Sequence, residues 1–209
     1  MSEEINIRKA EIFDLPYVYD ICLKTGDSGK DATALYNDPY LLGHYYAAPY
    51  LIYKKSICFV VEYQYRPQGY IIAAKDTADF EKWMEEKWLP PLRTFYKQPY
   101  PKELIRSEKE AHLINEIHIK NYPIDSESLK IYTEYPAHLH IDMLPCLQGK
   151  GLGRTLTEKL FAELKQQGVP GLHLGVGNAN KGATAFYQKL GFTVLKEHDW
   201  GFTMGKKCD

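Results

Sequence analysis

The chain has 209 residues, with 26 Lys and Arg side chains against 27 Asp and Glu side chains and a formal net charge of -1. This length suits one domain with a sizeable core. A charge near zero excludes the overall field that recruits nucleic acid or an anionic membrane surface, and no apolar run approaches the roughly 20 residues of a membrane span. We expect one soluble domain over 1–209, a monomer or dimer, with no nucleic-acid or membrane partner.

The cysteines and the first residues bear on the compartment. The cysteines at positions 22, 58, 146 and 208 form no CxxC pair, and the start, MSEEINIRKAEIF, contains no apolar signal-peptide core. Both features are typical of a reduced, cytoplasmic protein. A lone cysteine such as Cys146, with no paired base, is more often a small apolar filler than a nucleophile.

The N-terminal third of the sequence predicts a strand, two helical segments and a hairpin. Apolar residues alternate in the first run, recur at helical spacing in the next two, and gather in two β-rich runs on either side of a polar stretch. The expected elements are a strand at 5–8, helices at 10–25 and 39–53, and hairpin strands at 57–62 and 69–74.

The signal weakens over residues 76–136. Apolar residues between 80 and 88 lie near helical spacing ahead of Pro90-Pro91, and 103–119 is an amphipathic helix candidate. Because neither run is obviously part of the core, we interpret 76–136 as an insertion or lid.

Periodicity is clear again from residue 137 onward. The run A-H-L-H-I-D-M-L alternates with a period of two, so one face of this predicted strand carries His138, His140 and Asp142. After a glycine-rich corner, the expected elements are a helix at 152–167, a strand at 172–176, a helix at 181–190 and hairpin strands at 192–195 and 200–204.

The polar face of the strand raises the question of a metal site. Residues at i, i+2 and i+4 of one strand spread over roughly 13 Å end to end, which is too wide for three ligands of one ion. We therefore predict no metal. A polar face produced by alternation alone remains an equally good account of the two histidines.

Three glycines, Gly149, Gly151 and Gly153, crowd the stretch L-P-C-L-Q-G-K-G-L-G-R between the predicted strand and helix. A sharp turn into a helix leaves amide N–H groups of the first turn without carbonyl partners, and glycine lets a ligand approach them. The helix dipole adds positive potential, so this corner suits a phosphate or diphosphate. A tight turn that binds nothing is the alternative.

The spacing argues against two nucleotide motifs and favours another. A dinucleotide fingerprint needs glycine where Arg154 stands, and a P-loop needs Ser or Thr after Gly149-Lys150, where Gly151 stands. The stretch does match Gln148-x-x-Gly151-x-Gly153, which resembles the diphosphate-binding signature of the GNAT (GCN5-related N-acetyltransferase) superfamily.

A second motif supports this resemblance. Asn180-x-x-Ala183-x-x-x-Tyr187, followed by Lys189-Leu190-Gly191-Phe192, looks like the family's last helix and following strand. In the N-terminal half, 21–31 and Trp88-Leu89-Pro90 are similar to the acetyltransferase-like C-terminal domain of eukaryotic O-GlcNAcases and its stand-alone bacterial relatives. The cofactor loop is degraded in the eukaryotic domains, whereas its glycines are intact here.

The resemblance implies an α/β (α+β) GNAT fold, with a central mixed, mostly antiparallel sheet of about seven strands, helices on both faces, and a strand ending near Leu144 that splays from its neighbour at a bulge. The pantetheine arm of acetyl-CoA then lies in the gap, and a backbone amide near Met143 or Leu144 polarises the thioester carbonyl. The residues implied to bind acetyl-CoA are Met143, Leu144, Gln148, Gly149, Lys150, Gly151, Leu152, Gly153, Arg154, Asn180, Ala183 and Tyr187. For Lys150 and Arg154, solvated surface charge is the alternative.

The resemblance also implies direct attack of a primary amine, on a protein lysine or a small molecule, in a ternary complex with acetyl-CoA. By motif position Tyr187 stabilises the departing thiolate as its acid, although a tyrosine packed in the core would look the same in sequence. Asp142 is the first candidate for the base, provided that burial raises its pKa. His140, which needs less adjustment of its pKa, and a water relay are the others.

The acceptor side is expected from residues 24–53 and the 76–136 insertion. Three acidic residues in the first of these segments, Asp27, Asp31 and Asp38, favour a cationic amine, although acidic loops are commonly just solvated. The alternative function is a peptide- or glycan-binding module that kept the fold and lost the chemistry. The intact glycine loop favours the enzyme.

Overall fold

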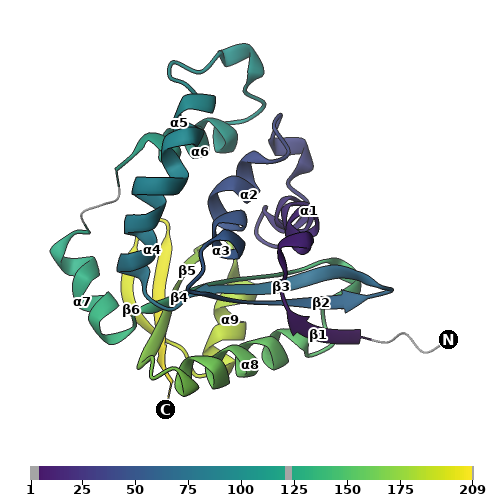
Figure 1. Ribbon diagram of the computed structural model, residues 1–209, viewed down its shortest axis with the longest axis vertical. Helices are drawn as coiled ribbons and strands as arrows, with labels where there is room; N and C mark the ends of the chain where they lie inside the picture. Colours follow the sequence, from purple (N-terminus) through teal and green to yellow (C-terminus); the bar gives the residue numbers. More distant parts are fainter. Residues whose placement is uncertain (1–4, 121–123, 209) are drawn as a thin grey trace.

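The computed structural model describes residues 5–120 and 124–208 (Figure 1). The predicted domain over 1–209 also includes 1–4, 121–123 and 209, and its insertion over 76–136 includes 121–123; these residues lie outside the described part of the chain. No helix in the described ranges is both long and apolar enough to cross a membrane.

A seven-stranded mixed sheet forms the centre of the fold, in the order β1-β2-β3-β4-β5-β7-β6. Every neighbouring pair is antiparallel except β4 and β5, which are parallel. This confirms the predicted mixed, mostly antiparallel sheet. The strands are β1 (Ile5–Lys9), β2 (Ser56–Tyr63), β3 (Arg66–Ala74), β4 (Ala137–Met143), β5 (Gly171–Gly177), β6 (Thr193–His198) and β7 (Gly201–Lys207).

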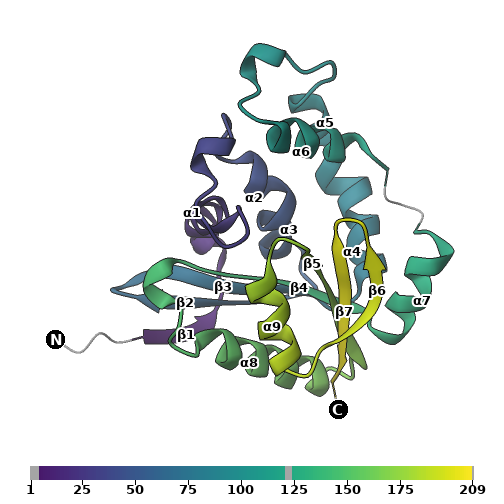
Figure 2. The same ribbon diagram turned by 180° about the vertical axis from the view of Figure 1, so that it is seen from behind.

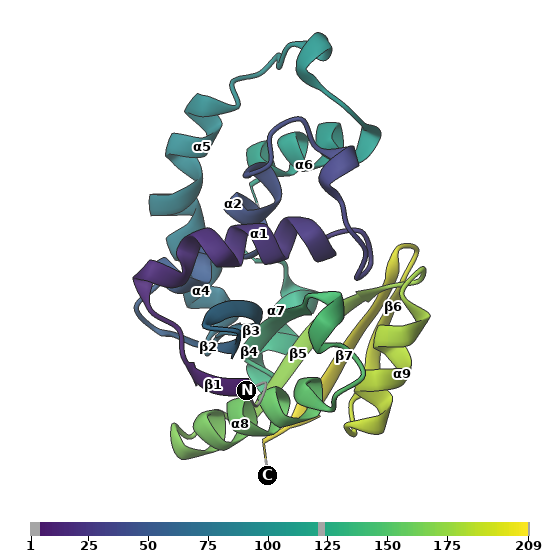
Figure 3. The same ribbon diagram turned by 90° about the vertical axis from the view of Figure 1, so that its right-hand side faces the viewer.

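Helices cover both faces of the sheet, as predicted. Figure 3 shows α1 on one side of the strands and α8 on the other, and Figure 2 shows α9 beside β7. The α-helices are α1 (Leu15–Thr25), α2 (Leu41–Tyr46), α3 (Ala48–Ile52), α4 (Thr77–Trp83), α5 (Leu89–Phe95), α6 (Glu108–His118), α7 (Ser126–Glu134), α8 (Leu152–Gln166) and α9 (Lys181–Lys189). Shorter turns are η1 (Ile12–Asp14), η2 (Thr33–Leu35), the π-helical η3 (Met84–Trp88), η4 (Lys102–Leu104) and η5 (Pro145–Leu147).

The period of two in the strands divides the apolar residues between two cores. In β3, Tyr70 and Ile72 pack with α1 to α6, whereas Ile71 and Ala73 pack with α8 and α9 on the other face. Both sets are fully buried. Side chains of β4 that point to the same face as Tyr70 and Ile72 therefore lie among helices α1 to α6.

Two elements of the N-terminal third differ from expectation. The single helix expected over 39–53 is broken at Ala47, whose φ of -133° is not helical, and α3 restarts with Pro49 in its first turn. The expected hairpin loop is shorter, because Gln64 and Tyr65 alone make the turn, both with positive φ. The strands consequently run to Tyr63 and from Arg66.

The 76–136 segment is more helical than its sequence signal indicated. Helices α4 and α5 form one rod together with η3 between them. Pro90 and Pro91 fall in the first turn of α5, immediately after the π-helical turn, so the missing proline N–H groups do not interrupt the rod. In Figure 1, α5 and α6 lie far from the sheet, above α1 and α2.

The sheet opens between β4 and β5. These two strands pair only at Ala137 with Leu172 and at His138 with His173, although both continue for several residues. The opening confirms the predicted splay. The expected bulge is not seen in the ladder on the other side of β4, where the register with β3 runs without a shift from Gly69 opposite Met143 to Ala74 opposite His138.

Candidate functional site

The glycine corner joins β4, through η5, to α8. Gly149 and Gly151 have φ values of 72° and 78°, and a Cβ built on either would meet nothing within 4 Å, so their backbone conformation and not crowding favours glycine. Gly153 differs, because a Cβ there would lie 3.0 Å from the ring of Phe186 and 3.3 Å from Met143. The third glycine therefore lets α8 pack closely against α9 and β4.

The corner leaves a row of amides without protein partners. The N–H of Gln148 donates to the carbonyl of Pro145, and that of Arg154 donates to Gly151. Between them, the N–H groups of residues 149–153 form no backbone hydrogen bond within the described parts of the chain. Five successive donors at the start of a 15-residue helix form a cradle for an anion.

The polar side chains around the corner point in different directions. The amide of Gln148 donates to the carbonyl of Met143 at 2.8 Å. The ammonium of Lys150 lies over the ring of Tyr63, 5.3 Å from its centre. The guanidinium of Arg154, which is exposed, lies 3.8 Å from a carboxylate one helical turn further along α8. Because Lys150 turns toward β2, backbone amides and not this side chain make the cradle.

A cavity of about 590 Å³ lies between the corner, the end of β4 and α9; we call it the corner cavity. Its lining contains every residue predicted to bind acetyl-CoA except Leu144 and Lys150, which the structure does not bring to it. The lining residues are Thr25, Gly29, Ile141, Asp142, Met143, Leu147, Gln148, Gly149, Gly151, Leu152, Gly153, Arg154, Asn180, Gly182, Ala183, Phe186, Tyr187, Lys189 and Leu190.

The edge of β4 that faces the opening follows from strand alternation. The N–H of Leu144 donates to the carbonyl of Gln68 at 2.9 Å, so it is used on the β3 side. In an antiparallel ladder consecutive residues direct their backbone groups to opposite sides. The N–H groups of Ile141 and Met143 therefore point toward the gap beside β5. Of the two amides predicted to polarise a thioester, only that of Met143 faces this gap.

Helix α9 positions the predicted acid. Asn180 caps the helix, since its Oδ1 accepts a hydrogen bond of 3.0 Å from the N–H of Ala183. Tyr187 is buried, with its ring edge-on to Phe186 and Phe192. Burial, and then the charge of Asp142, raises the pKa of Tyr187 above its ordinary value. The phenol is therefore protonated at neutral pH, and no other described residue hydrogen-bonds to its hydroxyl.

Asp142 lies at the far end of β4 from the paired segment. Its Oδ2 accepts a hydrogen bond of 2.7 Å from the hydroxyl of the fully buried Tyr70. Burial raises the pKa of Asp142, and the hydrogen bonds with Tyr70 and Thr25 oppose this shift. Thr25 already donates its one hydroxyl proton to the carbonyl of Ile21 at 2.7 Å, so a protonated Asp142 is the better partner for its oxygen. The condition set for Asp142 as a base, a raised pKa, is met.

A second cavity of about 590 Å³ lies on the other side of Asp142, between α1, α6 and the end of β5; we call it the α1 cavity. It shares Thr25, Gly29, Asp142 and Asn180 with the corner cavity. The Asp142 side chain therefore borders both spaces. The other residues of its lining are Cys22, Gly26, Ser28, Tyr36, Leu42, Tyr46, Glu108, Lys109, His112, Leu113, His140, Gly175 and Gly177.

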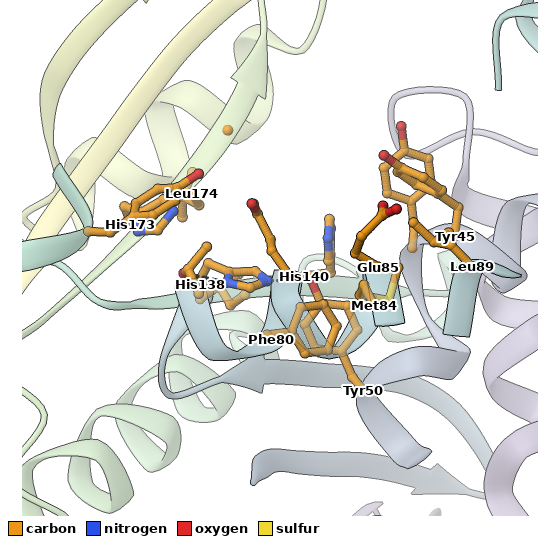
Figure 4. A pocket seen from close by; sticks show the side chains of 16 residues that line it. Tyr45, Tyr50, Phe80, Met84, Glu85, Leu89, His138, His140, His173 and Leu174 are labelled. Atoms are coloured by element: carbon orange, nitrogen blue, oxygen red, sulfur yellow. Dashed lines mark hydrogen bonds between the residues drawn. The ribbon is translucent and has the colours of Figure 1, made fainter. Parts of the chain in front are cut away.

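A third cavity, of about 250 Å³, follows along β4 and is shown in Figure 4; we call it the aromatic cavity. It shares Tyr46, His140 and Gly175 with the α1 cavity. Its other lining residues are Tyr45, Tyr50, Thr77, Phe80, Glu81, Met84, Glu85, Leu89, Tyr132, His138, Leu139, His173 and Leu174. The three cavities are thus neighbours in a row, with Asp142 at the first boundary and His140 at the second.

His140 is less suited than Asp142 to take a proton. Its ring lies edge-on to those of Tyr46 and Tyr50, with centroids 5.6 and 5.4 Å away. Burial lowers the pKa of His140 to about 4. The imidazole is consequently neutral at pH 7 and binds a proton weakly. Burial thus lowers the pKa of His140 and raises that of Asp142, which favours Asp142 as the base.

His138 is held by hydrogen bonds at both ring nitrogens. The hydroxyl of Thr77 donates to the carbonyl of Pro136 at 2.7 Å, so its oxygen must accept from Nδ1–H of His138, also at 2.7 Å. Nε2 is then unprotonated and accepts from the hydroxyl of Tyr50 at 2.6 Å. This ring is a structural element of the aromatic cavity. No group of three His, Cys, Asp or Glu side chains in the described ranges could hold a metal.

Sequence reasoning missed several residues of the site. Tyr70 contacts Asp142 and Phe186 lines the corner cavity, yet neither was predicted, and Thr25, which also contacts Asp142, was expected only as part of the 24–53 segment. Phe186 lies next to Tyr187 in the second motif, so attention to the neighbours of motif residues would have found it. Tyr70 precedes Asp142 by 72 residues, and no local pattern gives the register that places them opposite each other.

Comparisons with known proteins bear on this geometry. The model of the acetyltransferase (GNAT) family matches residues 30–192. The chain is 25% identical over 181 residues to protein O-GlcNAcase of Rattus norvegicus, a match that covers 86% of this chain and 19% of the relative. The chain thus spans about a fifth of the length of that relative. The predicted superfamily and its O-GlcNAcase-like resemblance are confirmed.

Solved structures agree with the fold. The crystal structure of SsHAT is 31% identical in sequence, with a TM-score of 0.83 and coverage of 99% of both chains. The PaiA N-acetyltransferase of Thermoplasma acidophilum, solved in complex with coenzyme A, is 16% identical, with a TM-score of 0.55 and coverage of 98% of this chain and 99% of that one. The second likeness shows the fold alone.

Proposed function

Because the chain belongs to the acetyltransferase (GNAT) family, whose members are acetyl-CoA-dependent N-acetyltransferases, we propose that it transfers the acetyl group of acetyl-CoA to a primary amine. The acceptor is a protein lysine or a small amine, which attacks directly in a ternary complex. The observation that carries this proposal is the position of Asp142, which borders both the corner cavity and the α1 cavity. A single carboxylate can therefore meet a donor on one side and an acceptor on the other.

Acetyl-CoA fits the corner cavity as a substrate. The free amides of residues 149–153 suit its diphosphate. Ile141 and Met143 direct their N–H groups into the gap between β4 and β5, where an extended pantetheine arm can pair with them. The N–H of Met143 would then lie where it can hydrogen-bond to the thioester oxygen as negative charge develops on it.

The chemical step assigns one role to each end of the site. An acceptor that arrives as an ammonium group loses one proton to Asp142, directly or through a water, and its neutral nitrogen attacks the thioester carbonyl. The new C–N bond forms as the C–S bond breaks, and the hydroxyl of Tyr187 gives its proton to the departing thiolate. The phenolate of Tyr187 then regains a proton from the nitrogen of the product. The raised pKa of Asp142 supports its role as the base, and the raised pKa of Tyr187 keeps the phenol protonated until the thiolate develops beside it.

The acceptor enters, in this proposal, through the α1 cavity. Residues of α1, α2 and α6 line it, so both the 24–53 segment and the 76–136 insertion take part in acceptor binding, as expected from the sequence. The proposal includes a cytoplasmic location, which is supported by the free thiols of Cys22, Cys58 and Cys146.

Ligand-dependent melting tests the proposal. Acetyl-CoA at about 100 times its Kd should stabilise the protein by about 2.7 kcal/mol, and ATP or NADH at the same concentration should not. Release of the CoA thiol should then depend on an added amine. Stabilisation without thiol release for any amine would favour the binding module, and the absence of stabilisation would overturn both the donor site and the transferase.

A further inference from the structure

We propose that the aromatic cavity binds a second cationic group of the acceptor, so that preferred acceptors carry two positive charges on the order of 10 Å apart. This inference rests on the proposed function, because Asp142 defines where the first amine reacts. The aromatic cavity lies beside His138, four residues before Asp142 on the same strand, which corresponds to about 13 Å. An acceptor that reaches from one to the other passes Tyr46 and His140.

Aromatic rings form much of the wall of this cavity. Tyr50 and Phe80 stack with their centroids 4.5 Å apart, and Tyr132 stacks on His173 at 4.6 Å. Figure 4 shows Tyr50 and Phe80 together on one side of the space and Tyr45 on another. Ring faces attract ammonium groups, most strongly where water is excluded.

The charges of the lining are negative. Glu81 and Glu85 line the cavity, and no Lys or Arg does. Arg93 neutralises Glu85 through two hydrogen bonds of 2.6 and 2.7 Å. Glu81 forms no ion pair with another described residue and is hydrogen-bonded with Tyr132. Glu81 is therefore the carboxylate in this cavity that remains without a cation.

The raised pKa of Glu81 is consistent with a buried carboxylate that has no cation beside it. Burial raises its pKa to about 7, against the opposing effect of the Tyr132 hydrogen bond. A cation placed beside this carboxylate would favour its ionised form and remove part of the penalty of burial. The neighbouring histidines do not supply such a charge, because burial lowers the pKa of His138, His140 and His173 below the ordinary value.

Several other polar groups of the cavity already have protein partners, which leaves fewer of them for a neutral polar ligand such as a sugar. Tyr50, Thr77 and both nitrogens of His138 form the chain of hydrogen bonds described above. Nδ1 of His173 bonds to the carbonyl of Tyr135 at 2.6 Å. Beside these pairs the cavity offers the carboxylate of Glu81 and aromatic rings, the combination that suits an alkylammonium group.

A matched pair of acceptors tests this inference. Diaminooctane and octylamine have the same carbon chain, but only the diamine places a second ammonium near Glu81. With saturating acetyl-CoA, we expect a KM for diaminooctane at least about tenfold below that for octylamine, beyond the twofold statistical advantage of two amines. Equal KM values after that twofold correction would overturn the inference.

Two variants on the same helical rod assign the effect to Glu81. Glu81→Gln is expected to bring the ratio of the two KM values close to two. Glu86→Gln removes an exposed carboxylate near the cavity and should keep the full ratio. Melting temperatures of both variants check that the fold is retained. A ratio that survives Glu81→Gln in a folded protein would contradict the assignment.

A probe that cannot be acetylated separates this site from the chemistry. Calorimetric titration with hexyltrimethylammonium should show binding that Glu81→Gln weakens about tenfold, and hexanol should bind much more weakly. Equal binding of hexanol would show an apolar cavity with no preference for cations and would overturn the inference. If no amine is acetylated but the ammonium probe binds as expected, the proposed transferase fails and the cation site stands.

Discussion

The hydroxyl of Tyr70, on β3, donates a hydrogen bond of 2.7 Å to the carboxylate of Asp142, directly opposite on β4. Tyr70 is fully buried, so this donor is fixed in place by the core on the α1 face of the sheet. The bond stabilises the ionised carboxylate in a site where burial favours the protonated form. The relationship determines how easily Asp142 takes and releases a proton.

Tyr70→Phe should move the acid limb of the pH profile upward. Burial already places the pKa of Asp142 above its ordinary value, and the lost hydrogen bond removes an interaction that lowered it. If Asp142 acts as the base, log(kcat/KM) falls as the pH is lowered through its pKa, and this fall should begin at a higher pH for the variant than for the wild type. Profiles between pH 4 and 9 with one amine measure this. A limb that stays in place would exclude Asp142 as the titrating group.

Asp142→Asn should separate catalysis from binding. We expect kcat to fall about 100-fold, as for the loss of a general base, while the Kd of acetyl-CoA stays within about twofold. Because the folded-state pKa of Asp142 is raised, its ionisation destabilises the fold as pH rises through that pKa. The melting temperature of the variant at pH 8 should therefore equal or exceed that of the wild type. An unchanged kcat would show that Asp142 is not the general base and would favour water as the proton acceptor.

Gly151→Ala tests the anion cradle against a matched control. Gly151 and Gly168 both have positive φ, of 78° and 71°, and open space around a built Cβ, but Gly168 lies at the far end of α8. Each alanine variant should lose about 1 kcal/mol of unfolding free energy. Only Gly151→Ala should also weaken acetyl-CoA binding, by about tenfold or more. Equal Kd values for the two variants would place the diphosphate elsewhere.

Much of the fold followed from local patterns. The predicted strand at 137–144 and helix at 152–167 match β4 and α8 to within one residue at their ends. The break at Ala47 and the π-helical turn before Pro90 were not predicted, because each depends on the packing of its helix and not on local spacing. Tertiary contacts override propensity at such points.

The residues of the site also fall into those that local patterns predicted and those that depend on distant contacts. The two motifs identified most of the corner cavity, since its walls come from β4, the corner and α9, which are close in sequence. The direction of Lys150 depends on Tyr63, and the use of the Leu144 amide depends on Gln68, both in the distant hairpin. The aromatic cavity draws on still more segments, so its composition could not be predicted from any one pattern. The roles of Asp142, His140 and Tyr187 in catalysis stay predictions until measured.

Arg8→Met should destabilise the protein in a pH-dependent way. Arg8 forms two hydrogen bonds of 2.7 and 2.8 Å to Asp14, whose side chain is 6% exposed. Burial alone would raise the pKa of Asp14, but the bonds from Arg8 and from the N–H of Glu11 hold it below its ordinary value. Removing the guanidinium leaves a buried carboxylate without its charge partner, which should cost about 3 kcal/mol of unfolding free energy at pH 7.

The sign of the pH dependence follows from the lowered pKa. The contribution of Asp14 is fully present above the unfolded pKa of about 3.9 and is lost as pH falls through the folded value. The difference between the wild type and Arg8→Met, measured by urea unfolding, should therefore narrow from pH 7 to pH 3. Lys24→Met removes an exposed ion pair with Asp20. It should change the free energy of unfolding by less than about 0.5 kcal/mol at pH 7 and at pH 3. A constant difference for Arg8→Met would mean that the side chain stabilises the fold by packing and not through Asp14.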